Sequence, residues 1–166
     1  MGSTETMPMK VLLVDDQFPE LELYRLAFTM HGHSVVTAAS GTQAIEIFGT
    51  EHPDAVLVDL ILGDMVGTEA IAKMREIGNA TFFLLSEAEP VVLDDAARRT
   101  GVRGFQKVGI PVGEVVREVS SGITLSRDAS KRPRKAGTRI RFLDPNDLEP
   151  RARPLGDAES TRSQVL

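Results

Sequence analysis

The strongest constraint on the fold is an alternation of two apolar patterns between residues 10 and 125. Short apolar runs, typical of buried strands, alternate with stretches in which apolar residues recur at helical spacing. The expected strands are Val11–Val14, 33–38, Ala55–Val58, 81–85 and 102–106. The expected helices are 19–30, 41–49, 68–77, 90–100 and 111–123. This alternation indicates an α/β fold, in which a doubly wound parallel sheet has helices on both faces and right-handed crossovers.

Apolar residues at helical spacing support each expected helix. In the first helix they are Leu23, Leu26, Ala27 and Met30. The inward residues expected in later helices are Ala44, Ile45 and Phe48, then Ala70, Ile71 and Met74, and finally Val112, Val115, Val116, Val119 and Ile123. Such stripes predict helices that pack against the sheet.

Polar side chains follow four of the five expected strands. They are Asp15 and Asp16 after the first, Asp59 after the third, Ser86 after the fourth and Lys107 after the fifth. Because parallel strands point the same way, these groups should gather at one edge of the sheet, where open α/β folds bind ligands. Each group alone also has an ordinary interpretation. The acidic residues could form turns or cap helices, Ser86 could cap a helix, and Lys107 could be solvated.

Together, three carboxylates, a hydroxyl and an ammonium group point to phosphoryl chemistry. Mg²⁺ takes oxygen ligands, which Asp15, Asp16 and Asp59 can supply, and a cation would relieve the repulsion among them. A carboxylate can also act as a nucleophile and carry an aspartyl phosphate. Lys107 and Ser86 would then stabilise the oxygens of the transferred group.

Composition limits the function and the location. The chain has 166 residues, enough for one domain, and no cysteine, which excludes disulfides, thiol catalysis and cysteine-type zinc sites. No apolar stretch approaches the roughly 20 residues that cross a bilayer. No secretory leader is visible at the start, so a cytoplasmic location is expected.

The balance of charge changes after residue 126. Residues 1–126 carry 18 acidic and nine basic side chains, whereas residues 127–166 carry six acidic and ten basic ones. The second segment has several prolines and few apolar residues to offset the entropy of ordering. The expected division is a flexible start at 1–8, a domain at 9–126 and a basic, disordered tail at 127–166.

With these motifs in order, the sequence resembles the receiver domain of two-component response regulators over roughly residues 9–125. The resemblance rests on Asp15–Asp16, Asp59, Ser86 and Lys107, with Gly67 in the loop after Asp59 and Phe105 two residues before the lysine. It implies a flavodoxin-like (βα)5 fold with strand order 2-1-3-4-5. It also implies Mg²⁺ held by Asp16, Asp59 and the carbonyl of Ile61, with help from Asp15.

The same resemblance implies a phosphoacceptor. Asp59 would accept a phosphoryl group from a histidine kinase or a histidine phosphotransfer protein, with Ser86 and Lys107 as the other catalytic residues. Ser86 and the switch residue Phe105 would then remodel the face of helix four, strand five and helix five, where a downstream protein would bind. The scheme is compatible with a phosphorylation-dependent dimer, and no membrane partner is expected. Residues 127–166 are too few and too polar for an output domain, so signalling through protein contacts or phosphoryl relay is expected. The chain would be no enzyme beyond its own phosphorylation and dephosphorylation.

Three positions depart from the family pattern. The loop Leu62–Gly63–Asp64 stands where the family commonly has Met-Pro, so a more flexible loop is expected. Glu87 replaces the usual small residue after the hydroxyl residue, and its charge would lie near the incoming phosphoryl group. Val108 follows Lys107 where the family has proline. Because a non-proline cis bond costs about 2.5–4 kcal/mol, this bond is expected to be trans.

The resemblance also bears on the lifetime of an aspartyl phosphate. In the family, the side chains two residues after the phosphorylated aspartate and two after the hydroxyl residue flank the approach of water. Here they are Ile61 and Ala88, and neither side chain can orient a water molecule. Slow self-dephosphorylation is therefore expected.

Other functional classes stay open at this point. A receiver-like scaffold or binding module that is never phosphorylated is favoured by Glu87 and by the missing Lys-Pro pair. A phosphatase of the haloacid dehalogenase type also has an aspartate nucleophile after a strand, but it needs a second aspartate where this chain has Ile61. The basic tail permits weak, salt-sensitive attraction to nucleic acid. Because no reading motif is visible, nucleic acid is not expected as a partner.

Overall fold

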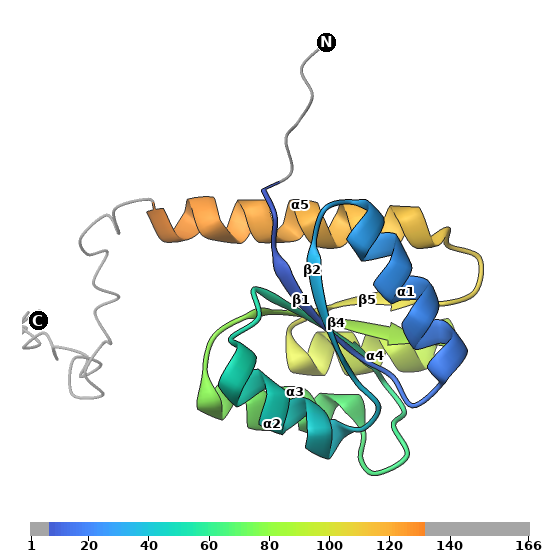
Figure 1. Cartoon of the computed structure of the whole chain (residues 1–166). Helices are drawn as coiled ribbons and strands as arrows, with labels where there is room; N and C mark the ends of the chain where they lie inside the picture. Colours follow the sequence, from blue (N-terminus) through green and yellow to red (C-terminus); the bar gives the residue numbers. More distant parts are fainter. Residues whose placement is uncertain (1–6, 132–166) are drawn as a thin grey trace, which may run out of the picture. The chain divides into compact units, whose positions relative to one another are not determined.

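A five-stranded parallel sheet organises residues 7–131, which are the residues that the computed structural model describes (Figure 1). The strands are β1 (Lys10–Val14), β2 (Ser34–Ala38), β3 (Ala55–Asp59), β4 (Thr81–Ser86) and β5 (Arg103–Gln106). The helices are α1 (Phe18–Met30), α2 (Gly41–Glu51), α3 (Gly67–Ile77), α4 (Pro90–Thr100) and α5 (Val112–Lys131). The strand order is β2-β1-β3-β4-β5, so the predicted flavodoxin-like fold is confirmed.

The last helix passes the expected end of the domain, because α5 continues beyond residue 126 to Lys131. The rest of the expected tail, residues 132–166, and most of the expected flexible start lie outside the described residues. Within the described part of the chain, no helix combines the length and the apolar character that crossing a bilayer requires.

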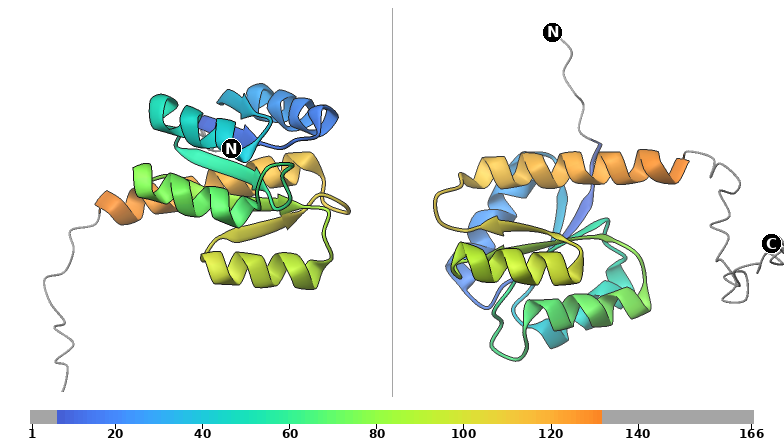
Figure 2. Two further views of the ribbon diagram at one scale, coloured as in Figure 1. Left: turned by 90° about the horizontal axis from the view of Figure 1, so that it is seen from below. Right: turned by 180° about the vertical axis from the view of Figure 1, so that it is seen from behind.

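The sheet separates two apolar layers (Figure 1; Figure 2). On one face α2, α3 and α4 pack with residues such as Phe48, Met74 and Leu93. On the other face α1 and α5 pack with residues such as Phe28 and Val119. All five residues of β3 are buried, which explains why its sequence is a continuous apolar run rather than an alternating one. Because apolar layers cover both faces of the sheet, the strands are held in place. Their carboxyl ends, which carry the polar groups, are therefore held in place as well.

The buried face of α1 differs from the pattern that predicts the helix. Leu21, Tyr24 and Phe28 are buried. Leu23 and Met30 are 51% and 77% exposed, respectively. Leu26 is also exposed. Both sets have helical spacing, and burial of the larger Tyr24 and Phe28 removes more apolar area from water. In the later helices the expected inward residues are buried or packed against the two layers.

Candidate functional site

The strand register brings the polar strand ends to one edge of the sheet. Val14 of β1 pairs with Val58 of β3, and Asp59 pairs with Leu85 of β4. Lys107, which follows β5, donates its backbone N–H to the Ser86 carbonyl over 2.9 Å. The groups at the carboxyl ends of β1, β3, β4 and β5 therefore lie side by side, as the alternation of strands and helices predicts.

Lys107 is the electrostatic centre of this edge. Its Nζ lies 2.8 Å from Asp15 Oδ2, 2.8 Å from Asp59 Oδ2 and 2.7 Å from Glu20 Oε2. The lysine side chain is only 6% exposed, so the interpretation of Lys107 as a solvated surface residue is wrong. Burial opposes the charged form, but the three carboxylates outweigh it and raise the pKa of Lys107 above its usual value. The ammonium group is therefore held charged at the phosphoacceptor candidate.

Three carboxylates at this edge could share a cation. Oxygen atoms of Asp15, Asp16 and Asp59 all lie within 4.8 Å of one another, with Asp16 exposed and the other two buried. Burial raises the pKa of Asp15, although its hydrogen bonds with Lys107 and with the Gln17 N–H oppose this rise. An all-oxygen donor set with one solvent-facing carboxylate fits Mg²⁺, a hard cation that keeps some of its water.

Neither Ser86 nor Asp59 caps a helix, so this ordinary interpretation of the two groups is wrong. Ser86 does not cap α4, whose N-terminal cap residue is Glu89 and has no side-chain cap. The buried Ser86 Oγ instead accepts the Ala88 N–H over 3.0 Å in the turn after β4. Asp59 does not cap α3, which begins after Val66 and has no side-chain cap either. Asp15 does form a turn, because its Oδ1 accepts the Gln17 N–H over 2.8 Å.

The loop between Asp59 and α3 is tightly tied. The Gly67 N–H donates to the Leu60 carbonyl over 2.8 Å. A Cβ on Gly67 would collide with the Asp59 carbonyl oxygen, so this close approach requires glycine. Asp64 accepts hydrogen bonds from the backbone N–H of Gly41 and of Thr42, both over 2.8 Å, at the start of α2. The loop was expected to be flexible, but the bonds of Asp64 to α2 and the bond between Gly67 and Leu60 hold it.

The segment after Lys107 positions the lysine without the proline that the family has directly after it. No peptide bond in the described part of the chain is cis, so the expected trans bond before Val108 is present. Gly109 takes a φ of +86°, a conformation that favours glycine, and turns the chain toward α5. Ile110 then packs against the core layer under α1 and α5. Together with the Lys107 N–H bond to Ser86, this turn positions the lysine.

Phe105, the expected switch residue, is buried in β5. Its ring centroid lies 5.9 Å from that of Phe83. The Arg103 guanidinium lies 5.2 Å from the centroid of the Phe105 ring. The side chain therefore belongs to the layer that contains α5, next to the strand that ends at Lys107.

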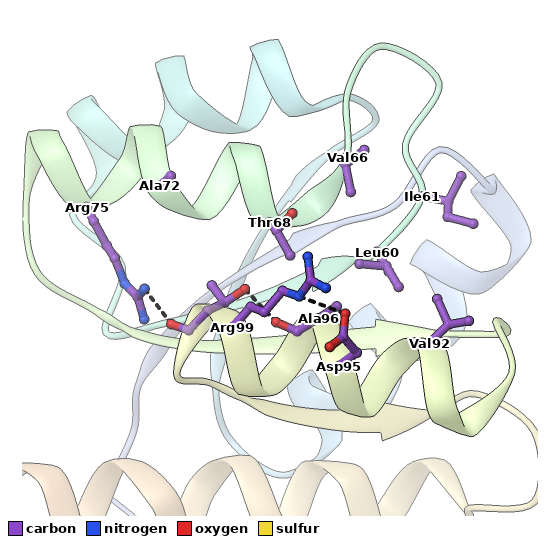
Figure 3. Close-up of a pocket in the computed structure, with 11 residues that line it drawn as sticks. Leu60, Ile61, Val66, Thr68, Ala72, Arg75, Val92, Asp95, Ala96 and Arg99 are labelled. Atoms are coloured by element: carbon purple, nitrogen blue, oxygen red, sulfur yellow. Dashed lines mark hydrogen bonds and ion pairs between the residues drawn. The ribbon is translucent and has the colours of Figure 1, made fainter.

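A groove of ≈ 590 Å³ lies between α3 and α4, apart from the carboxylates (Figure 3). Leu60 and Ile61, which follow Asp59, form one end of it. The Arg75 Nη1 donates to the Thr100 carbonyl over 2.7 Å at the other end. The sequence patterns did not predict this groove, because its wall combines residues from α3, from α4 and from the loop between β3 and α3.

Glu20 is the residue of the site that the sequence analysis missed. It lies in the first turn of α1, and its partner Lys107 follows β5, so no local pattern joins them. The available signal is its position four residues after Asp16, at the helix start that faces the same sheet edge.

Comparisons with known proteins agree with the fold. The family model described as the response regulator receiver domain matches residues 11–106. The probable transcriptional regulatory protein TcrX of Mycobacterium tuberculosis is 32% identical over 100 residues, which are 60% of this chain and 43% of that protein. Sporulation initiation phosphotransferase F of Bacillus subtilis is 38% identical over 71 residues, 43% of this chain and 57% of that protein.

The chain spans about two fifths of the length of the first curated relatives that it matches. Among solved structures, a CheY-like response regulator receiver domain protein from Methanospirillum hungatei JF-1 has a TM-score of 0.68. It is 17% identical, and the match covers 74% of this chain and 98% of that one. At this identity the likeness supports the fold alone.

Proposed function

Because the chain belongs to the response regulator receiver family, we propose that it is a phosphoacceptor that receives a phosphoryl group on Asp59 from a phosphohistidine. The donor would be a histidine kinase or a histidine phosphotransfer protein. The observation that carries the proposal is the contact of 2.8 Å between Asp59 Oδ2 and the buried ammonium of Lys107, beside Asp15 and Asp16. We assign this role to residues 9–126.

The transfer uses the Asp59 carboxylate as nucleophile. One of its oxygens forms a bond to phosphorus while the bond from phosphorus to the histidine nitrogen breaks, and the electron pair leaves with the imidazole. Lys107 stays close and neutralises charge on the phosphoryl oxygens. In the unphosphorylated chain the Ser86 hydroxyl accepts the Ala88 N–H. After rotation of the side chain, this hydroxyl donates a hydrogen bond to one of the phosphoryl oxygens.

Asp16, Asp59 and the Ile61 carbonyl, with Asp15 beside them, would hold Mg²⁺. The cation would supply positive charge against the phosphoryl oxygens and against the clustered carboxylates. Asp15 also keeps Lys107 in place through the ion pair of 2.8 Å. Asp16, which is exposed, is the carboxylate that faces the solvent from which the cation enters.

The signal passes from the site to the surface through two elements. Movement of Ser86 toward the phosphoryl group would pull on the turn at Ala88, whose carbonyl accepts a hydrogen bond of 3.0 Å from Gln106 Nε2 in β5. Phe105 precedes Gln106, so its burial would change with the same strand. The face of α4, β5 and α5 would then bind a downstream protein or a second copy of the chain.

The donor protein has a candidate contact surface on α1. Leu23, Leu26 and Met30, which we term the apolar strip, are exposed on the side opposite the buried face. The helix that carries the apolar strip begins two residues after Asp16 and bears Glu20. A helix that presents a histidine could pack on this strip and bring its phosphorus to Asp59.

The test is the intact mass of the chain after incubation with Mg²⁺ and acetyl phosphate. We expect the gain of one phosphoryl group, lost again in hydroxylamine, and no gain in Asp59→Asn. An unchanged mass with every donor would favour the alternative, a receiver-like binding module that is never phosphorylated. That alternative draws on Glu87, an acidic residue directly after Ser86.

A further inference from the structure

Glu20 makes a contact that phosphoryl transfer does not require. A glutamate in the first turn of a helix is favourable for the helix dipole alone. Here its Oε2 also lies 2.7 Å from the buried Lys107 Nζ, and its side chain is 27% exposed. Glu20 therefore reaches from the surface of α1 into the site and adds a third carboxylate to the lysine.

Glu87 is a second acidic side chain close to Glu20. It is exposed, and it directly follows Ser86, the last residue of β4. The neighbouring Glu20 carboxylate raises the pKa of Glu87, Lys107 lowers it, and Asp59 adds to the rise. Two acidic side chains from α1 and from the turn after β4 thus lie together near Lys107 and Asp59. We call Glu20 and Glu87 the acidic rim.

We propose that the acidic rim selects phosphoryl donors by charge, a specificity that rests on the proposed phosphorylation of Asp59. A dianionic acyl phosphate must bring its charge past two carboxylates to reach Asp59. A phosphoryl group on nitrogen carries less net negative charge, because the leaving nitrogen is protonated. The rim therefore disfavours free acyl phosphates and favours phosphoramidates, the class to which phosphohistidine belongs.

The two donors transfer the phosphoryl group by the same kind of step. The Asp59 oxygen forms a bond to phosphorus with its own electron pair. With acetyl phosphate the P–O bond to the acetyl group breaks, and acetate leaves with the electron pair of the broken bond. With phosphoramidate the P–N bond breaks, and the protonated nitrogen leaves as ammonia. For each donor the bond broken and the leaving group are the same in every variant, so a change of rate between variants reports the charge of the acidic rim.

The experiment compares phosphorylation rates with acetyl phosphate and with phosphoramidate, at saturating Mg²⁺ and low salt. Glu87→Gln and Glu20→Gln keep the side-chain shape and remove one negative charge each. Glu76→Gln is the matched control, because Glu76 is exposed near the end of α3, at the opposite edge of the sheet. Circular dichroism and the Mg²⁺ affinity of each variant verify folding and metal saturation.

We expect each rim variant to raise the acetyl phosphate rate roughly three- to tenfold, because local charge changes association rates by such factors or more. The phosphoramidate rate should change less, the control should change neither rate, and 0.5 M salt should shrink the difference. Equal effects on both donors, or no acceleration in either rim variant, would overturn the inference while leaving the phosphoacceptor role intact. Failure of both donors to phosphorylate any of the proteins would overturn the proposed function, and the inference with it.

Discussion

Asp64 links the phosphoacceptor loop to the helix beside it. Its carboxylate accepts hydrogen bonds from two backbone N–H groups and from the Thr42 hydroxyl at the start of α2. The Thr42 backbone bond, the Thr42 hydroxyl bond and the Gly41 bond lower the pKa of Asp64 from 3.8 to about 2. Because the folded pKa lies below the usual value, the stabilisation is present above pH 3.8 and is lost as the pH falls toward 2.

We therefore expect Asp64→Ala to lower the denaturant midpoint at pH 7, and the deficit to shrink between pH 4 and pH 2. Urea unfolding across this range measures it. Asp94→Ala, at an exposed position in α4, is the control for loss of a carboxylate and should change the midpoint less at pH 7. A deficit that stays constant down to pH 2 would show that Asp64 does not act as a charged cap.

Gly67 is required for steric reasons. Its position against the Asp59 carbonyl leaves no room for a Cβ, so Gly67→Ala should cost roughly 1–3 kcal/mol of unfolding free energy. Gly113→Ala in α5 is the matched control, since nothing lies within 4 Å of the added atom there. That substitution should stabilise the helix by about 0.5–1 kcal/mol. Thermal unfolding of both variants tests this, and equal shifts would contradict the steric argument.

Ile61 and Ala88 bear on how long a phosphoryl group would stay on Asp59. Ile61 is 64% exposed beside the site, and neither side chain can orient a water molecule for attack on phosphorus. A polar group in such a position contributes a factor of about 10² or more when it acts as a base. The native chain should lose its phosphoryl group at least about tenfold more slowly than an Ile61→Asn, Ala88→Glu double variant after donor removal. Val91→Asn, exposed on α4, should decay like the native chain, whereas equal decay of the native chain and the double variant would refute the idea.

At the scale of the element, α1 has a buried face and an exposed apolar face. Its buried face holds the helix to the sheet, and the apolar strip covers the solvent side. A change of Leu23 and Leu26 to serine should leave phosphorylation by acetyl phosphate unchanged and slow transfer from a phosphohistidine protein about tenfold or more. Val91→Ser and Val92→Ser on α4 form the control pair. Equal slowing with both kinds of donor would mean that the change disturbs the site rather than the docking surface.

The elements themselves follow from local pattern, and their faces follow only in part. In Ala55–Val58 and in α3 the sequence contains only one apolar pattern. The residues that are buried there can therefore be predicted. In α1 two apolar sets share the helical spacing, and only packing against β2 and α5 decides between them. Sequence pattern alone therefore locates this helix but not its buried face.

At the scale of the whole molecule, the sheet converts distant sequence positions into one site. The groups after four strands were predictable, because parallel strands share the direction of their carboxyl ends. The third partner of Lys107 was not, because Glu20 belongs to a helix and reaches the site through side-chain length. The hydrogen bond by which Asp64 ties the loop to α2 was not predictable either, because it joins two segments that no periodicity relates.

The most direct measurement is the position of the acyl phosphate in the phosphorylated chain. Borohydride reduces an aspartyl phosphate to homoserine, which marks the modified residue in a peptide digest. After phosphorylation with Mg²⁺ and a small donor, we expect homoserine at position 59 and aspartate at positions 15 and 16. Homoserine at either of those positions, or an unreduced residue 59 in protein that has gained the phosphoryl mass, would contradict this expectation.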